Sequence, residues 1–410
     1  MKSKRWVLLI FVFAILMLIE GLSYLSLFLL DKKFDVQYDP NVSTLSEEQK
    51  SHLRNFLNRK KGERAGQDPV LGWINRSEVN SAGMRDNIEY DKVPTAGKIR
   101  ISAFGDSFTF GADVKLRDTW EKQLTLLDPS IEVLNYGAGA YGLDQAYLLY
   151  LRVGTEYSPN IVFIGYMSEN IARNVNVFRE FYTSYYRDVI FTKPRFKVRD
   201  GDLVLIENPL STLEDYKHFL FNDKDVLARL GENDYHYQTN YNRGAFDFLQ
   251  SVRFVKVFSH YLIIKVLNPI FNINGMYNVN SEAYGVTVKI FDNFYHKVLE
   301  NGSLPIILIF PDINDQRRSR DKKIRRYTPL ITYFRSKGYR FIDTLGALEP
   351  YESRYTVDEL VENWGHYSPL GNRIIAEYIY LQLKNWDLLN LTKLKEEIKV
   401  EYERLGTDIR

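Results

Sequence analysis

The chain opens with one long apolar segment. Apolar side chains fill the run from Trp6 to Leu30, and Glu20 is its only charged residue. As a helix that rises 1.5 Å per residue, this run is about 37 Å long, which exceeds the roughly 30 Å hydrocarbon core of a bilayer. The run therefore predicts a transmembrane helix, residues 6–30, within an N-terminal segment 1–30.

The flanks of this segment bear on its orientation and its fate. Basic residues precede it, which favours a cytoplasmic N-terminus, although two lysines that follow it weaken that inference; these residues are Lys2, Lys4, Arg5, Lys32 and Lys33. Gly21 and Ser23 form a pair of small residues typical of a cleavage site, so a cleaved signal peptide is the alternative. Because the apolar run continues to Leu30, we expect a retained signal-anchor with the bulk of the chain periplasmic or extracellular.

Strand-like and helix-like patterns alternate from residue 98 onward, after a polar stretch (residues 31–97) that we interpret as a stalk and lead-in segment. Five short apolar runs bounded by turn residues predict buried strands: Ile99–Phe104, Ile131–Asn135, Ile161–Tyr166, Pro305–Phe310 and Tyr339–Asp343. Helical patterns lie between and after them: Thr119–Leu127, Leu143–Glu156, Glu282–Glu300, Arg326–Lys337 and Pro369–Leu383. This alternation predicts an α/β fold, a three-layer sandwich with a parallel sheet, whose ligands bind at the carboxyl ends of the strands.

The alternation is interrupted between about residues 175 and 280, which predicts a large insertion in a domain that spans residues 98–385. The insertion contains a hairpin pattern, Phe196–Ile206, which turns at Asp200-Gly201-Asp202. It is also aromatic, and aromatic rings stack on sugars or simply pack together; the aromatic residues are Phe178, Phe181, Tyr182, Tyr185 and Tyr186. The final segment, Trp386–Arg410, predicts a charged amphipathic helix that packs on the body through Leu389, Leu394 and Ile398.

Composition excludes several classes of function. The net charge of +2 gives no general electrostatic support for a nucleic-acid partner. The chain has no cysteine, so disulfides and thiolate metal sites are ruled out. Its histidines show no metal-ligand spacing, and we predict neither a metal nor a cofactor. The oligomeric state stays open.

Four polar segments follow the predicted strands. The first is Gly105–Gly111 (GDSFTFG), and the others are Asn135–Gln145 (NYGAGAYGLDQ), Gly165–Asn170 (GYMSEN) and Gly365–Asn372 (GHYSPLGN). Ser107 lies between a strand end and a helix start. That position suits a nucleophile, because the N–H groups and the partial positive charge of a helix start stabilise a developing oxyanion.

In this order, the four segments resemble the SGNH hydrolases, also called GDSL-like esterases, over roughly residues 98–385 without the insertion. The resemblance implies a flavodoxin-like fold with a five-stranded parallel sheet and an acyl-enzyme mechanism. It implies that Ser107 is the nucleophile and His366 its general base. It also implies an oxyanion hole made by the N–H of Ser107, a backbone N–H of the second segment and the side-chain amide of Asn170.

The second segment departs from the family at Ala140. The family usually has Gly there, five residues after the Asn, as the backbone donor of the oxyanion hole. We expect the donor to survive the change if φ of Ala140 is negative, and Gly139 is the neighbouring candidate.

The fourth segment departs from the family at Asn363, where an Asp is usual three residues before the His. Asn cannot stabilise an imidazolium by charge and can hold the wrong tautomer. Some family members orient the His with a main-chain carbonyl, and Glu362, Asp358 or Asp343 are further possible acids. The third member of the triad therefore stays open.

The resemblance and the predicted anchor together imply a serine esterase, or acetylesterase, for O-acyl and in particular O-acetyl esters of extracytoplasmic polysaccharide. An O-acetyltransferase that uses the same residues is an alternative. A catalytically inactive glycan-binding module is another, motivated by Asn363. Residues 137–142 fit the dinucleotide-binding pattern G-x-G-x-x-G, so a nucleotide-binding oxidoreductase is a further alternative. Against it, the strand before this pattern is the second of the sheet and not the first.

Overall fold

The computed structural model describes residues 2–34, 44–60, 66–75, 77–182, 190–240, 244–262, 270, 275–362 and 365–407. The chain divides into two compact units. One consists of Met1–Asn58, Asn176–Phe191 and Thr212–Ile273. The other consists of Arg59–Val175, Thr192–Ser211 and Asn274–Arg410, and it holds every segment that the sequence marked for chemistry.

The second unit is built on a five-stranded parallel sheet, as predicted. Its strands are β3 (Ile99–Gly105), β4 (Ile131–Gly137), β5 (Ile161–Met167), β8 (Leu304–Phe310) and β9 (Phe341–Asp343). All neighbouring pairs are parallel, and the spatial order is β4-β3-β5-β8-β9. Taken in chain order this is 2-1-3-4-5, the flavodoxin-like order. The predicted fold class is confirmed.

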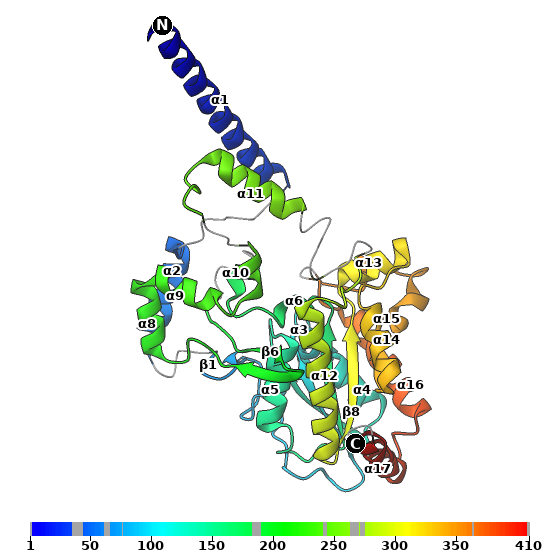
Figure 1. The fold of residues 1–410 in the computed structure, drawn as a ribbon. Coiled ribbons are helices and arrows are strands. Elements are labelled where there is room, and N and C mark those ends of the chain that lie inside the picture. The colour runs from blue at the N-terminus through cyan, green and yellow to red at the C-terminus, as the bar shows by residue number, and fades with distance from the viewer. Residues whose placement is uncertain are drawn as a thin grey trace. The chain divides into compact units, whose positions relative to one another are not determined.

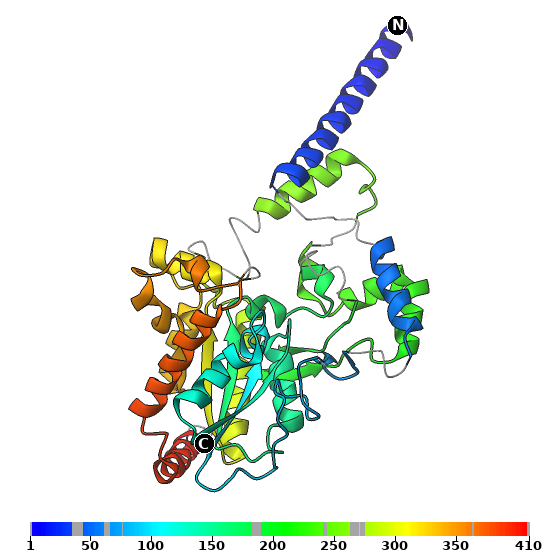
Figure 2. The same ribbon diagram turned by 180° about the vertical axis from the view of Figure 1, so that it is seen from behind.

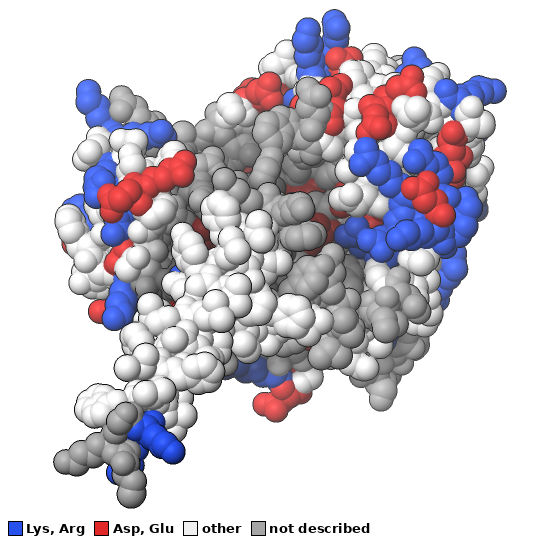
Figure 3. Space-filling model, turned by 90° about the horizontal axis from the view of Figure 1, so that it is seen from above, with Lys and Arg blue, Asp and Glu red and all other residues white. Residues whose placement is uncertain are grey.

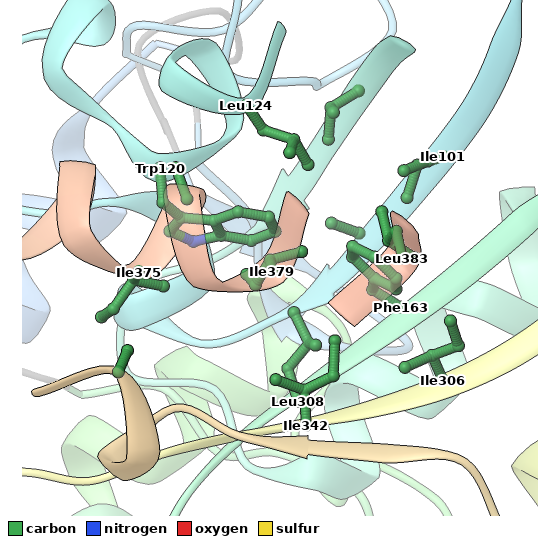
Figure 4. Close-up of a cluster of buried hydrophobic side chains, with 14 of the residues drawn as sticks. Ile101, Trp120, Leu124, Phe163, Ile306, Leu308, Ile342, Ile375, Ile379 and Leu383 are labelled. Carbon is green, nitrogen blue, oxygen red and sulfur yellow. The ribbon is translucent and has the colours of Figure 1, made fainter. Parts of the chain in front are cut away.

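Helices cover both faces of this sheet (Figures 1 and 2). On one face, α4 (Trp120–Leu127) and α16 (Pro369–Asn385) pack on alternate strand residues, because successive strand side chains point to opposite faces. Figure 4 shows this core of buried side chains: Ile101, Trp120, Leu124, Phe163, Ile306, Leu308, Ile342, Ile375, Ile379 and Leu383. On the other face, α5 (Leu143–Val153) and α12 (Glu282–Glu300) bring Tyr150 against Phe104 and Phe291 against Tyr166.

Several further predicted elements are present in this unit. The predicted hairpin is the antiparallel pair β6 (Arg195–Arg199) and β7 (Asp202–Ile206). The helices predicted near residues 326–337 and 386–410 are α14 (Thr328–Lys337) and α17 (Leu391–Thr407), and Leu394 of α17 is fully buried. The helix start expected at Ser107 is α3 (Ser107–Phe110). The unit also contains elements that the sequence pattern did not predict: β1 (Gln67–Asp68), β2 (Gly72–Trp73), η1 (Leu116–Asp118), α6 (Asn170–Arg173), α13 (Ile313–Lys322), α15 (Leu345–Leu348), η4 (Glu349–Tyr351) and η5 (Val357–Glu359).

The other unit is helical. It contains α1 (Lys2–Phe34), α2 (Glu47–Asn58), α7 (Arg179–Tyr182), α8 (Leu213–Phe221), α9 (Asp223–Gly231), α10 (Tyr235–Asn240) and α11 (Gln250–Leu262). For Phe178 and Phe181 the sequence left sugar stacking and ordinary packing open, and the structure shows packing. Both are 1% exposed and pack edge to face at 5.3 Å, as part of this unit's core. The side chain of Tyr182, and the whole of Tyr185 and Tyr186, lie outside the described residues.

The predicted apolar N-terminal helix is present as α1. Its apolar part, Lys4–Leu30, is 27 residues long and could cross a membrane by length and composition. The same description fits a membrane anchor and a signal sequence.

Candidate active site

Ser107 lies where β3 passes into α3. Asp106 is the N-cap of that helix, and its Oδ1 accepts a hydrogen bond of 2.8 Å from the N–H of Phe108. The turn requires glycine at residue 105, because a Cβ there would lie 2.1 Å from Oγ1 of Thr109. Ser107 is the first residue of α3, so its N–H has no acceptor within the helix. Ser107 thus provides both a hydroxyl oxygen, Oγ, and a backbone N–H that no carbonyl of the helix accepts.

His366 lies beside Ser107, although the two are 259 positions apart in the sequence. Nε2 of His366 is 2.8 Å from Oγ of Ser107. The loop that bears His366 is fixed on both sides. The N–H of Glu362 donates to the carbonyl of His366, and Asn372 donates to the carbonyl of Tyr367. Phe108 packs against the imidazole, with ring centroids 5.1 Å apart.

Asp113 completes a hydrogen-bonded chain of three side chains. Its Oδ2 is 2.6 Å from Nδ1 of His366, on the side of the ring opposite Ser107. The His366 and Asp113 side chains are 20% and 26% exposed, so both are reached by solvent. This is the spatial order of a nucleophile, a base and an orienting acid.

A buried arginine from the lead-in segment holds the loop that carries Asp113. The side chain of Arg85 is 1% exposed. Its guanidinium donates to the carbonyls of Phe110 and Val114, each at 2.6 Å, and to that of Gly111. These three carbonyls flank Asp113, whose φ of 68° is in the left-handed region. Burial lowers the pKa of Arg85, although it remains a cation near neutral pH.

The acids that the sequence analysis considered lie elsewhere. Asp343 accepts from Arg325 and Tyr327, at 2.7 and 2.9 Å. Asp358 pairs with Arg317 at 2.5 Å, and Glu362 contacts His366 through its backbone only. Asn363 lies outside the described residues. The sequence analysis missed Asp113, although a signal existed: it follows Ser107 by six positions at the same carboxyl edge of the sheet.

Asn170, the first residue of α6, lies next to Asp106. Its Nδ2 donates to Oδ2 of Asp106 at 2.8 Å, and it is 1% exposed. An amide nitrogen has two hydrogens, so one remains for another acceptor. Burial raises the pKa of Asp106, opposed by the charge of Arg173 and by the hydrogen bonds from Phe108 and Asn170. Asp106 thus links the helix start at Ser107 to the side chain of Asn170.

The second polar segment contributes Gly139 and Ala140 at the same edge of the sheet. The N–H of Gly139 donates to Oδ1 of Asn75 at 3.3 Å, and its carbonyl accepts from Nε1 of Trp73. The backbone N–H and carbonyl of Gly139 are therefore both hydrogen-bonded to residues of the lead-in segment. Ala140 has φ of 61°, so the negative φ that the sequence analysis set as the condition for this donor is not found. The backbone keeps the left-handed conformation that a glycine adopts without cost.

We expect Ala140→Gly to stabilise the fold. An alanine in the left-handed region costs about 1–2 kcal/mol, and the extra freedom of glycine in the unfolded chain costs about 0.4–1 kcal/mol. The free energy of unfolding should therefore rise by roughly 0.5–1 kcal/mol, measured by urea denaturation. The matched control is Ala138→Gly, where φ is not positive and stability should fall. Equal losses of stability in the two variants would contradict the strain at Ala140.

The glycine-rich pattern at residues 137–142 has a packing explanation. A Cβ on Gly137 would lie 2.1 Å from the backbone nitrogen of Phe110, so this glycine lets β4 approach α3. That contact places the second segment against the helix of Ser107. Within the described residues, no group of three or more His, Asp or Glu side chains has the arrangement of a metal site.

No protein-family model matches the sequence, and no curated protein matches it. Solved structures of low sequence identity are similar to this chain, each with a TM-score below 0.5. One is a putative lipolytic protein of the G-D-S-L family from Desulfitobacterium hafniense DCB-2 (15% identity, 69% of this chain and 99% of that chain, TM-score 0.34). A second is a member of the lipolytic G-D-S-L family from Veillonella parvula DSM 2008 (11% identity, 70% of this chain and 97% of that chain, TM-score 0.32). A third is a lipase/acylhydrolase from Enterococcus faecalis (13% identity, 70% of this chain and 96% of that chain, TM-score 0.33).

Proposed function

We propose that this protein is a serine esterase, with Ser107 as nucleophile, His366 as general base and Asp113 as the orienting acid. The single observation that supports this most is the continuous chain of hydrogen-bond distances, 2.6 Å from Asp113 to His366 and 2.8 Å from His366 to Ser107. The sequence has Asn at position 363, and the lack of a carboxylate there suggested an inactive binding module. In the proposed site, Asp113 provides that carboxylate. An esterase therefore accounts for these three side chains better than a non-catalytic role.

The mechanism follows from these positions. Nε2 of His366 removes the proton of Ser107 as Oγ attacks the ester carbonyl, and a C–O bond forms while the carbonyl oxygen becomes an oxyanion. Asp113 fixes the tautomer of the neutral His366 ring and stabilises the imidazolium through Nδ1. The oxyanion then collapses, the bond to the alcohol oxygen breaks, and His366 gives the proton to the leaving alkoxide while the acyl group stays on Ser107. Water, deprotonated by the same nitrogen, attacks the acyl carbon, the bond to Oγ breaks, and Oγ takes the proton back from His366 as the carboxylic acid is released.

The oxyanion requires donors that exist before the reaction, because such donors need no reorganisation at the transition state. The proposed donors are the N–H of Ser107 and the second N–H of the Asn170 amide, with a backbone N–H of Gly139 or Ala140 as the third. Asp106 supports two of them, since it caps the helix of Ser107 and orients the amide of Asn170. The N–H of Gly139 donates to Oδ1 of Asn75 at 3.3 Å.

We further propose that the substrate is an O-acetylated carbohydrate outside the cytoplasm and that α1 is a membrane anchor. The support is the length and apolar composition of α1, the basic residues before it, and the resemblance of the four polar segments to the SGNH hydrolases. Members of that family anchored outside the cytoplasm often add or remove acetyl groups on polysaccharides. Phe178 and Phe181 are buried, so they do not support sugar binding, and the proposal depends on the other observations.

The test is acetate release by the full chain, purified in detergent, from p-nitrophenyl acetate and from acetylated oligosaccharides. We expect turnover of both, with the oligosaccharides preferred in kcat/KM. Fast turnover of long-chain acyl esters with none of the acetylated sugars would overturn the carbohydrate part of the proposal. Appearance of the acetyl group on an added acceptor sugar, and not as free acetate, would assign an acetyltransferase.

A further inference from the structure

Helix α1 is uncovered by protein over its first half. The described side chains from Lys4 to Ile19 are exposed, and nearly all of them are apolar. Figure 3 shows α1 as a white surface, with basic residues only at its N-terminal end. The covered face begins at Glu20 and continues through Ser23, which is 8% exposed, to the partly buried Leu27 and Leu30. These positions recur every three to four residues, so they form one stripe along the helix.

The element that covers this stripe is α11, which lies beside the C-terminal half of α1 in the same unit (Figures 1 and 2). The carboxylate of Glu20 accepts hydrogen bonds from the N–H of Gln250 at 2.6 Å and from the N–H of Ser251 at 3.2 Å. The hydroxyl of Ser251 donates to the same carboxylate. Glu20 therefore acts as a cap for the first turn of α11, from a position 230 residues earlier in the chain.

This contact joins two groups that are each unfavourable in an apolar medium. A carboxylate within an apolar helix is unfavourable in lipid, because it loses its contacts with water. The N–H groups of a helix's first turn lack acceptors, and no water is present in lipid to provide them. Glu20 and the start of α11 satisfy each other. Cleavage near Gly21 and Ser23 would remove this acceptor, so the contact favours retention of α1 over a cleaved signal peptide.

Three large apolar side chains lie on the exposed side of α11, together with the small polar side chain of Ser259. Val255, Phe258 and Leu262 are 60%, 48% and 43% exposed, and their spacing of three and four residues puts them on one side of the helix. Phe246 and Phe248, just before α11, are 65% and 73% exposed. Large apolar side chains gathered on an exposed face mark a site of protein or membrane interaction.

The position of Glu20 along α1 decides between these partners. It lies 16 residues after Lys4, which corresponds to about 24 Å of helix. With Lys4 and Arg5 at one surface of a bilayer whose hydrocarbon core is about 30 Å thick, Glu20 lies just inside the opposite boundary. α11 packs on α1 at that depth, so its exposed apolar side chains meet the same medium as α1 does.

We propose that α11 is an interfacial membrane helix, docked on a retained α1 by Glu20, with Val255, Phe258 and Leu262 in the lipid. The partner of this surface is the bilayer itself. The proposal rests on the membrane anchor proposed above. It adds a second membrane-bound element, from the mid-chain insertion, which ties the insertion to the membrane surface.

The absence of native cysteine allows a direct test by single-cysteine labelling. The full chain with Val255→Cys or Phe258→Cys is reconstituted in vesicles of phosphatidylethanolamine and phosphatidylglycerol and treated with a membrane-impermeant maleimide. Each labelling rate is normalised to the rate in denaturant. Phe221→Cys, 79% exposed, is the aqueous control, and Leu16→Cys, 55% exposed, is the lipid control.

We expect Val255→Cys and Phe258→Cys to react about tenfold more slowly than Phe221→Cys, in the range of Leu16→Cys. If Leu16→Cys is protected but the two α11 positions react like Phe221→Cys, the α11 proposal is overturned and the anchor stands. If Leu16→Cys also reacts freely, the anchor fails and the α11 proposal with it. If Val255→Cys is protected but forms a disulfide-linked dimer on oxidation, the surface binds a second copy, which also overturns the proposal.

The role of Glu20 has its own variant. Glu20→Leu keeps α1 apolar and removes the acceptor, so the labelling rate of Val255→Cys in that background should rise several-fold toward that of Phe221→Cys. Glu20→Gln retains one acceptor oxygen and should give a smaller rise. An unchanged rate in Glu20→Leu would show that Glu20 does not dock α11.

Discussion

Replacing Ser107 by alanine is expected to lower kcat/KM for ester hydrolysis by about 10⁵-fold. The physical reason is that no acyl-enzyme forms without Oγ. The remaining donors, at Asn170 and at Gly139 or Ala140, retain only the part of the rate acceleration that comes from binding and oxyanion stabilisation. Acetate release from p-nitrophenyl acetate, measured at enzyme concentrations high enough to detect the residual rate, checks this expectation.

Two controls make the result specific. Ser107 is 9% exposed and lies on a four-residue helix, so the loss of one hydroxyl should leave the unfolding transition within about 1 kcal/mol of the parent. Ser336→Ala, at an exposed position on α14, should leave kcat/KM unchanged. A Ser107→Ala variant that retains most of its activity would exclude the acyl-enzyme mechanism.

Replacing Asp113 by asparagine is expected to lower kcat by about 10³–10⁴-fold with a small change in KM. Asparagine keeps the size and removes the charge, so the imidazolium of His366 loses its stabilising carboxylate and the amide can favour the wrong tautomer. The loop itself should remain in place, because Arg85 holds it through the carbonyls of Phe110 and Val114 and not through the side chain of Asp113. Steady-state kinetics on the same ester measure the effect.

The comparison variant is Asp358→Asn, which removes an acid that the sequence alone left open. Asp358 is 71% exposed and pairs with Arg317, so its removal should leave kcat within about twofold of the parent. The pair of variants decides which carboxylate serves His366. A loss of activity in Asp358→Asn with none in Asp113→Asn would reverse the assignment made here.

The fold followed from local patterns. The five strands were predicted within two residues at each end, because buried parallel strands are short apolar runs whose bounds are turn residues. Of the short elements that build the site, α6 was not predicted, and α3 was expected only as a helix start at Ser107, without its length. A helix of four residues is too short to show a period, and the chain adopts it because Asp106 caps it and Gly105 permits the turn before it.

By itself, the sequence determined the α/β sheet, the candidate nucleophile Ser107 and the neighbouring segments that contain Asn170 and His366. These depend on patterns within a few residues of one another. Only the tertiary structure decided that Asp113 faces His366 and that Glu20 faces the start of α11, across 253 and 230 positions of sequence. A single carboxylate in a loop or in an apolar helix has no local signature of its partner. The partner is fixed by the path of the chain, here by the buried Arg85 that positions one loop and by the packing of α11 on α1.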